Sequence, residues 1–283
     1  MKLQKVMGII IITVLLLFAC TRGENSREES VSKGVFSWHS LVEEKDCGSL
    51  HQYGIDTVYQ HIKSSCSYEE VENFLETMSL QGMEVFLLDG EANWAYERHY
   101  DSVKNSLERV RSINRELYRR RGNDKGELKI KGLVLDIEPY LLKEWEENAD
   151  IILDGMCRNL EMLYADKEEL QIYLCVPYFY DSKGYEEQLE QLIRYTDGLL
   201  VMNYYKGSEI VHMETEVRLA AQYKKKIITV YELQEPGKHG LTEKNTYYND
   251  GLDAVRLNYQ QLREAYPEYR IGVAYHECNY FRN

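Results

Sequence analysis

Residues 129–140 read KIKGLVLDIEPY, and this stretch indicates how the chain folds. Its central run, GLVL at 132–135, is apolar and short, which is typical of a strand buried on both faces of a parallel sheet. Two acidic residues, Asp136 and Glu138, follow the run directly. Side chains two positions apart on a strand point to the same side, so the stretch predicts a buried strand that ends in paired carboxyl groups.

Similar runs recur on both sides of this stretch, and longer amphipathic segments separate them. The expected strands are 34–39, 54–60, 83–89, 129–137, 170–177, 198–204, 226–233 and 270–276. The expected helices, with apolar residues at spacings of three and four, are 68–81, 98–121, 143–165, 184–196, 210–223 and 250–266. Eight strands in alternation with helices predict an α/β protein with a closed (β/α)₈ barrel, the TIM-barrel fold.

An open doubly wound sheet is the alternative α/β architecture. Its first strand would be followed by a glycine-rich turn that binds phosphate, whereas residues 38–40 here are WHS. We therefore expect a barrel, as one domain over residues 34–283, and no bound cofactor. The sequence ends soon after the eighth strand, so the final helix is expected to be missing and the first helix to be short.

The first residues have the anatomy of a secretory leader. Two lysines precede an apolar segment of about 13 residues, which is too short to cross a membrane comfortably. Residues 17–20, LFAC, resemble the bacterial lipobox, so we expect 1–19 to be removed and Cys20 to be lipidated. The polar stretch 20–33 is expected to be a flexible tether. This predicts a lipoprotein on the outer side of the bacterial cell membrane; an ordinary signal peptide or an uncleaved anchor is the alternative.

Charge and composition restrict the partner. The chain has 34 Lys and Arg against 47 Asp and Glu, spread without a basic stripe, so nucleic acid is not an expected partner. The 24 tyrosines combine an apolar face with a polar tip, which suits stacking on sugar rings. The same property suits the edge of a core, so composition is compatible with a carbohydrate ligand without requiring one.

Five cysteines follow Cys20, and none forms the C-x-x-C spacing of a metal clip. Cys157 and Cys175 lie within apolar patterns, so we expect buried thiols there rather than nucleophiles. A disulfide between Cys47 and Cys66 stays open for an exported protein, because sequence alone does not establish the pairing.

In a (β/α)₈ barrel the active face is formed by the carboxyl ends of the strands and the loops after them. Residues at these ends that are expected to contact a ligand are Trp38, His39, Gln60, Asp89, Tyr178, Asn203, Tyr205 and His276. Glu232 ends the seventh expected strand, so we expect it to line the same mouth as Glu138. A zinc site is weighed for His39, His61, His276 and Asp136, because histidines and carboxylates at strand ends hold zinc in many barrel hydrolases. No H-x-H follows the first strand, and no metal is expected.

Asp136 and Glu138 are the expected chemical centre. One carboxylate beside another raises the pKa of its neighbour. A Glu138 kept protonated in this way would donate its proton to a leaving oxygen, which is the general acid role in glycoside hydrolysis. The other interpretations are a pair of polar residues without chemistry and half of a metal site.

At these residues the sequence resembles the family 18 glycoside hydrolases, which are chitinases and endo-N-acetylglucosaminidases. That family ends its fourth strand in D-x-x-D-x-D-x-E and carries M-x-Y on its sixth. Asp136 and Glu138 match the last two acidic positions, and residues 202–204, MNY, match M-x-Y. Lys131 and Val134 replace the two earlier aspartates of the family motif.

The resemblance implies a mechanism in which the substrate assists. Glu138 would be the general acid, and Asp136 would orient the N-acetyl group of the substrate as it attacks the sugar carbon. Tyr204 would hold the carbonyl of that group. The eighth strand of the family usually ends near a tryptophan, whereas residues 274–276 here are AYH.

Two alternatives stay open. Many retaining glycosidases with this fold use one glutamate after the fourth strand and another after the seventh, and Glu138 and Glu232 match that placement. Against it, Ile137 stands where an asparagine usually precedes the first glutamate, and Asp136 would have no role. The other alternative is a glycan-binding surface lipoprotein without turnover, because a fold does not establish catalysis.

Overall fold

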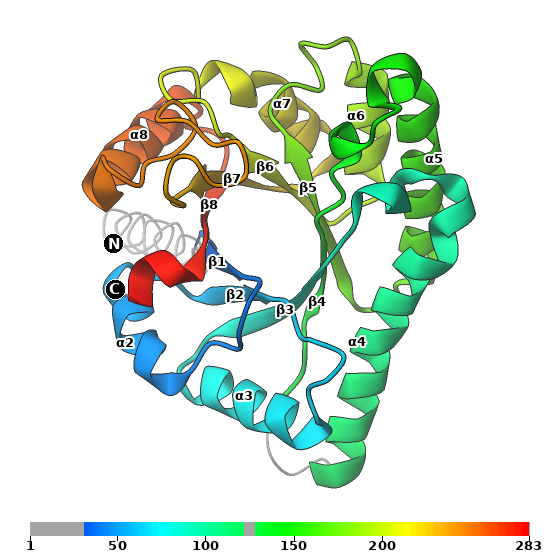
Figure 1. The fold of residues 1–283 in the computed structure, drawn as a ribbon, viewed down its shortest axis with the longest axis vertical. Coiled ribbons are helices and arrows are strands. Elements are labelled where there is room, and N and C mark those ends of the chain that lie inside the picture. The colour runs from blue at the N-terminus through cyan, green and yellow to red at the C-terminus, as the bar shows by residue number, and fades with distance from the viewer. Residues whose placement is uncertain (1–30, 122–127, 283) are drawn as a thin grey trace, which may run out of the picture. The chain divides into compact units, whose positions relative to one another are not determined.

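The strands form a closed ring in the computed structural model, which describes residues 31–121 and 128–282 (Figure 1). They are β1 (Lys33–Ser37), β2 (Thr57–Gln60), β3 (Glu84–Asp89), β4 (Gly132–Leu135), β5 (Gln171–Pro177), β6 (Gly198–Met202), β7 (Lys226–Glu232) and β8 (Ile271–His276). Each strand pairs in parallel with the next, and β1 pairs with β8, with Gly34 opposite Ala274. The predicted (β/α)₈ barrel is confirmed.

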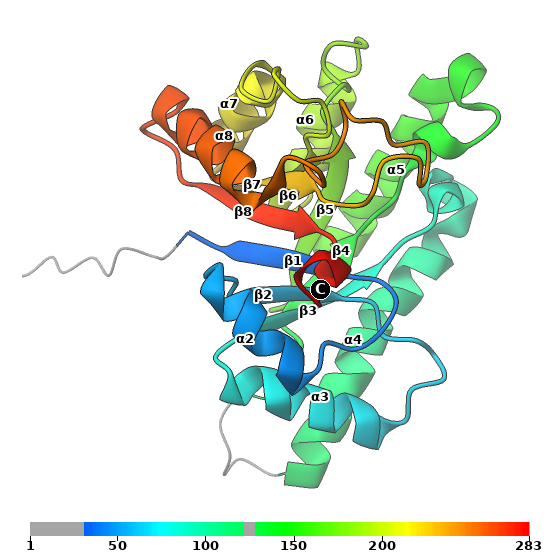
Figure 2. The same cartoon turned by 60° about the vertical axis from the view of Figure 1, so that its left-hand side comes forward.

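Helices surround the ring on its outer side (Figure 1, Figure 2). They are α2 (Glu44–Gln52), α3 (Tyr68–Leu80), α4 (Tyr100–Arg121), α5 (Trp145–Asp166), α6 (Glu186–Arg194), α7 (Glu214–Tyr223) and α8 (Gly251–Ala265). The helix after β1 is short, as expected. In the described residues β8 is followed by a 3₁₀ turn, Cys278–Arg282, instead of a helix, so the expectation about the last helix is also confirmed.

The alternation of side chains divides the core into two parts. Val134 points into the barrel, whereas its neighbours Leu133 and Leu135 belong to the larger cluster between strands and helices. The inner part consists of Phe36, Tyr59, Phe86, Leu88, Val134, Tyr173, Cys175, Leu200, Met202, Ile228, Val230 and Ala274. Because both faces of each strand are buried, the strands read as continuous apolar runs in the sequence.

Gly90 determines how closely the ends of β3 and β4 approach. A Cβ at this position would collide with the backbone carbonyl of Asp136. The Asp136 N–H donates to the carbonyl of Asp89 at 3.0 Å. The close approach that glycine permits therefore fixes the backbone from which the Asp136 side chain projects.

The expected leader, Cys20 and the tether up to residue 30 lie outside the described residues. The first strand begins at Lys33, so it includes the last residue of the expected tether. Among the described helices, none is both long enough and apolar enough to cross a membrane.

The cysteines of the described chain are all free thiols. Cys47 and Cys66 therefore form no disulfide in this structure. Cys157 and Cys175 are buried, as their apolar surroundings in the sequence predicted.

Candidate active site

We call the end of the barrel formed by the carboxyl ends of the strands and the loops after them the barrel mouth. At four of the strands, polar side chains follow the inner core there. The inward positions continue from Val134 to Asp136 and Glu138, and from the last inward residues of β6, β7 and β8 to Tyr204, Glu232 and His276. Since all strands are parallel, these five residues lie at the same end of the barrel.

Asp136 is the most perturbed carboxyl group of the mouth. Its Oδ1 is buried and has no hydrogen-bond partner. Burial, and then the charge of Glu138, raise the pKa of Asp136 to about 7, although His276 and the Cys175 thiol act in the opposite direction. The sequence analysis did not single out Asp136 for a raised pKa, which the structure shows with burial as its largest cause.

Glu138 is oriented by a residue that the sequence analysis did not single out. The hydroxyl of Tyr140, in the 3₁₀ turn Pro139–Leu141, donates to Oε2 of Glu138. The ring of Tyr140 packs edge-on against Phe179, with 5.4 Å between centroids. Tyr140 therefore holds Glu138 in one orientation.

Glu232 and His276 form a contact across neighbouring strands. They are opposite each other in the register of β7 and β8, and Oε2 of Glu232 lies 2.8 Å from Nδ1 of His276. The other carboxyl oxygen accepts the N–H of Gln234 at 2.7 Å. The Glu232 side chain is 3% exposed, so both of its oxygens are committed to the protein.

Tyr204 lies among the charged groups of the mouth. Burial, and then the charges of Glu232 and Asp136, raise the pKa of its hydroxyl well above the ordinary value. Its ring centroid is 6.5 Å from that of His276. The carbonyl of Tyr204 accepts from the Asn245 side chain at 2.8 Å, which ties the loop after β6 to the loop after β7. Tyr204 is thus a neutral hydroxyl donor beside Asp136.

Aromatic residues of the mouth occur in two further groups. Trp38, after β1, lies against His61 with 5.4 Å between ring centroids. Tyr178, after β5, is 6.4 Å from Tyr205 and stacks on His212 at 4.1 Å. These rings provide apolar faces of the kind that sugar rings pack against. His39, another residue predicted to contact a ligand, is exposed, and its Nε2 lies 3.9 Å from Oε2 of Glu277.

Three predicted ligand contacts are used elsewhere. Gln60 donates to backbone carbonyls of the loop after β1 and is fully buried. Asp89 accepts from the Ser106 hydroxyl of α4 at 2.6 Å, and Asn203 donates to the carbonyl of Glu209 at 2.9 Å. These residues occupy the outward positions that alternate with the inward ones, so the prediction that they contact a ligand in the mouth is not supported.

The histidines that we weighed as zinc ligands have other contacts, with His61 against Trp38 and His276 beside Glu232. Within residues 31–121 and 128–282, no group of three or more His, Cys, Asp or Glu is placed to hold a metal ion. The arrangement of the mouth is therefore one of carboxyl groups, a phenol and an imidazole.

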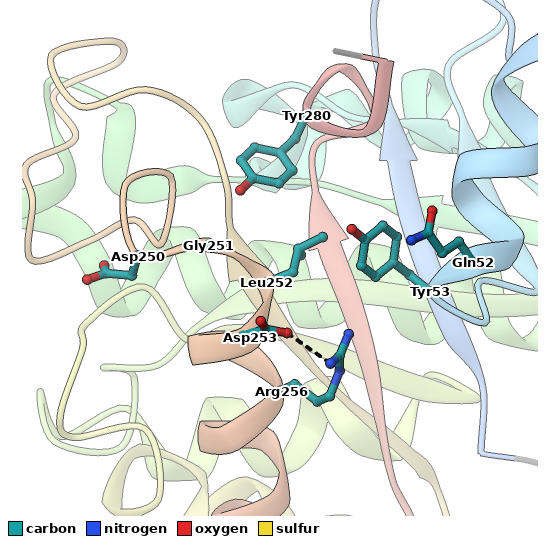
Figure 3. A pocket seen from close by; sticks show the side chains of 8 residues that line it. All are labelled: Gln52, Tyr53, Asp250, Gly251, Leu252, Asp253, Arg256 and Tyr280. Atoms are coloured by element: carbon teal, nitrogen blue, oxygen red, sulfur yellow. Dashed lines mark hydrogen bonds and ion pairs between the residues drawn. The ribbon is translucent and has the colours of Figure 1, made fainter.

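A separate pocket of about 360 Å³ lies between the end of α2 and the start of α8. Figure 3 shows Tyr53 and Tyr280 in its wall and Arg256 paired with Asp253, at 2.9 Å. It contains none of the site residues predicted from the sequence, and the mouth remains the candidate active site.

Comparison with known proteins supports the fold. No family model matches the sequence, and no curated protein matches it. A GH18 chitinase from Pseudoalteromonas aurantia is 12% identical over 89% of this chain and 97% of its own, with a TM-score of 0.53. A GH18 chitinase from Cycas revoluta is 12% identical over 88% and 95%, with a TM-score of 0.53. The endo-β-1,4-mannanase from Thermotoga petrophila is 11% identical over 88% and 68%, with a TM-score of 0.55. The chain thus has the barrel fold of these glycoside hydrolases.

Proposed function

We propose that the chain is a glycoside hydrolase of a cell-surface or extracellular glycan, with Glu138 as the general acid and Asp136 assisting. The observation that carries this proposal is the pair of carboxyl groups at the mouth, in which Asp136 keeps a buried oxygen without a partner. A buried acceptor without a donor is costly in free energy. The N–H of an N-acetylated sugar would supply that donor.

The proposed reaction uses the substrate as its nucleophile. Glu138 gives its proton to the glycosidic oxygen as the bond from this oxygen to the sugar carbon breaks. The carbonyl oxygen of the N-acetyl group attacks that carbon, while Asp136 accepts the N–H and Tyr204 donates to the carbonyl. Water then opens the cyclic intermediate and returns a proton to Glu138.

The contacts of Glu232 favour this route over the route with two protein carboxylates. A nucleophilic Glu232 would need a free oxygen directed at the sugar carbon. Both oxygens of Glu232 accept hydrogen bonds instead, and the side chain is almost fully buried. Asp136, which has no role in the two-carboxylate route, has a free oxygen.

We also propose that Cys20 anchors the protein by lipid to the outer side of the cell membrane. The sequence of residues 1–20 supports this part of the proposal.

Glycan binding without turnover is the second candidate. It is favoured by Val134, which stands at an acidic position of the family 18 motif and is buried in the inner core below Asp136. Asp136 therefore has an apolar neighbour in its own strand where that motif has a carboxyl group.

Hydrolysis assays distinguish the two candidates. N-acetylated glycans, followed by neutral β-glycans, should be incubated with the wild type, with Glu138→Gln, and with Glu147→Gln as a control on the exposed face of α5. We expect Glu138→Gln to reduce hydrolysis by a factor of about 10² or more and the control to leave it unchanged. Equal binding by all three proteins, with no turnover, would leave the glycan-binding candidate.

A further inference from the structure

We propose that Glu232 and His276 form a positioning pair that keeps a cation beside Asp136, and so favours the proton of the two mouth carboxyl groups on Glu138. The inference rests on the proposed function and extends it to the control of the general acid. Glu232 becomes a positioning residue in this arrangement and not a nucleophile.

The pair is rigid because the backbone holds it from several sides. The residues are opposite each other in the β7–β8 register, with 2.8 Å between Oε2 and Nδ1. The N–H of Gln234 fixes the second oxygen of Glu232 at 2.7 Å. The N–H of Tyr247 donates to the Glu232 carbonyl at 2.9 Å, so the loop after β7 returns to the same residue. The imidazole therefore has one orientation, set by its Nδ1.

Charge balance favours a positively charged His276. A carboxylate that is 3% exposed is unfavourable unless a positive group pairs with it. In the described part of the chain, the ion pair of Glu232 is with His276. Burial opposes the charge on His276, but the charge of Glu232 and its hydrogen bond outweigh burial, and the pKa of the imidazole is raised.

The imidazole also faces the chemical centre. Besides Glu232, the charges that act on His276 are Asp136, from the end of β4, and Glu277, which follows β8. The uncharged rings around it are Phe36 and Tyr204, at 5.6 and 6.5 Å between centroids. His276 in turn lowers the pKa of Asp136, against burial and the charge of Glu138. One cation is therefore shared by two carboxylates.

This cation corrects an imbalance in the pair of carboxyl groups. Burial and the charge of Glu138 favour a proton on Asp136, and its raised pKa of about 7 already includes the opposing effect of His276. General acid catalysis needs that proton on Glu138. A positive His276 stabilises Asp136 as a carboxylate and so favours transfer of the proton from Asp136 to Glu138, with no change in the total charge.

Two substitutions remove the cation while keeping the shape of the mouth. His276→Asn retains a donor at the position of Nδ1 without a charge. Glu232→Gln leaves the imidazole but removes the carboxylate that holds it protonated. His51→Asn is the matched control, since His51 is exposed in the last turn of α2.

Activity against pH provides the first measurement. We expect both variants to move the acidic limb of kcat/KM to higher pH by about one unit, which is a loss of about tenfold on that limb. The double variant should shift no further than either single one, because both remove the same charge. Loss of turnover at every pH in Glu232→Gln alone would identify a nucleophile and overturn the proposal. An unchanged pH profile with lowered stability would overturn it as well.

A titration followed by NMR tests the pair without any substrate, so its outcome is independent of the proposed function. We expect the pKa of His276 to lie above its ordinary value in the wild type and to fall in Glu232→Gln. The pKa of the Asp136 carboxyl should rise in His276→Asn and stay constant in His51→Asn. If His276 titrates at or below its ordinary pKa, or if Asp136 does not respond, the proposal is wrong even for an active enzyme.

Discussion

Glu216 is a buried carboxyl group that the proposed reaction does not use. It lies on α7 with 0% exposure, and neither carboxyl oxygen has a hydrogen-bond partner in another described residue. Burial is the main cause that raises its pKa, to about 8. The substitution Glu216→Gln keeps the size of the side chain and removes its titration, so it should stabilise the folded protein at every pH at which the wild-type group is ionised in the unfolded chain.

The size of the effect follows from the two pKa values. Below the ordinary value of 4.5 the group is protonated in the folded and the unfolded chain, and the substitution has little effect. Between pH 4.5 and about 8 unfolding releases a proton, so the free energy of unfolding falls by about 1.4 kcal/mol per pH unit. At pH 7 the accumulated loss is about 3 kcal/mol, and above pH 8 it stops growing.

Chemical unfolding at pH 5, 6, 7 and 8 measures this directly. The difference in unfolding free energy between Glu216→Gln and the wild type should grow with pH over this range. The control is Glu214→Gln, which changes an exposed glutamate on the same helix and should show no such trend. If the unfolding free energies of the wild type and Glu216→Gln keep a constant difference from pH 5 to 8, the reasoning is refuted. Such a result would mean that the folded state does not resist ionisation of Glu216.

Three further predictions concern the site and the anchor. Asp136→Asn removes the group whose pKa is about 7, so both the rate of hydrolysis and its change around pH 7 should be lost; an unaltered pH–rate profile would count against a role for Asp136. Gly90→Ala introduces a methyl group against the Asp136 backbone and should lower the unfolding free energy by about 1–3 kcal/mol in chemical unfolding, whereas wild-type stability would contradict the close approach. Cys20→Ala should release the protein from the membrane fraction or leave an unprocessed precursor; normal processing and retention on fractionation would argue against lipidation.

The strands could be predicted because each one is buried on both faces and therefore has a continuous apolar sequence. The run before Asp136 is the clearest case, since Leu133 and Leu135 face helices while Val134 fills the barrel. The ends of elements differ by a few residues, as with β4, which ends at Leu135 and not at residue 137.

The direction of side chains at the strand ends was predicted less well. Asp89 and Asn203 were assigned to the mouth because they end strands, yet side chains alternate, and both face outward. Because Leu88 and Met202 point into the barrel, the next inward side chains lie two residues further along, and not at Asp89 or Asn203. This alternation would have excluded Asp89 and Asn203 from the mouth. The contacts of Glu138 with Tyr140 depend on a 3₁₀ turn whose geometry no pattern in the sequence specifies.

Leaving-group dependence tests the central claim, that Glu138 protonates the departing oxygen of an N-acetylated sugar, more directly than any other measurement. Two substrates should carry the same sugar, one with a second sugar as leaving group and one with an acidic phenol, which departs without a proton. We predict that Glu138→Gln slows the first substrate by a factor of about 10² or more and the second far less. Equal losses on both substrates, or no loss on either, would contradict the assignment of Glu138 as the general acid.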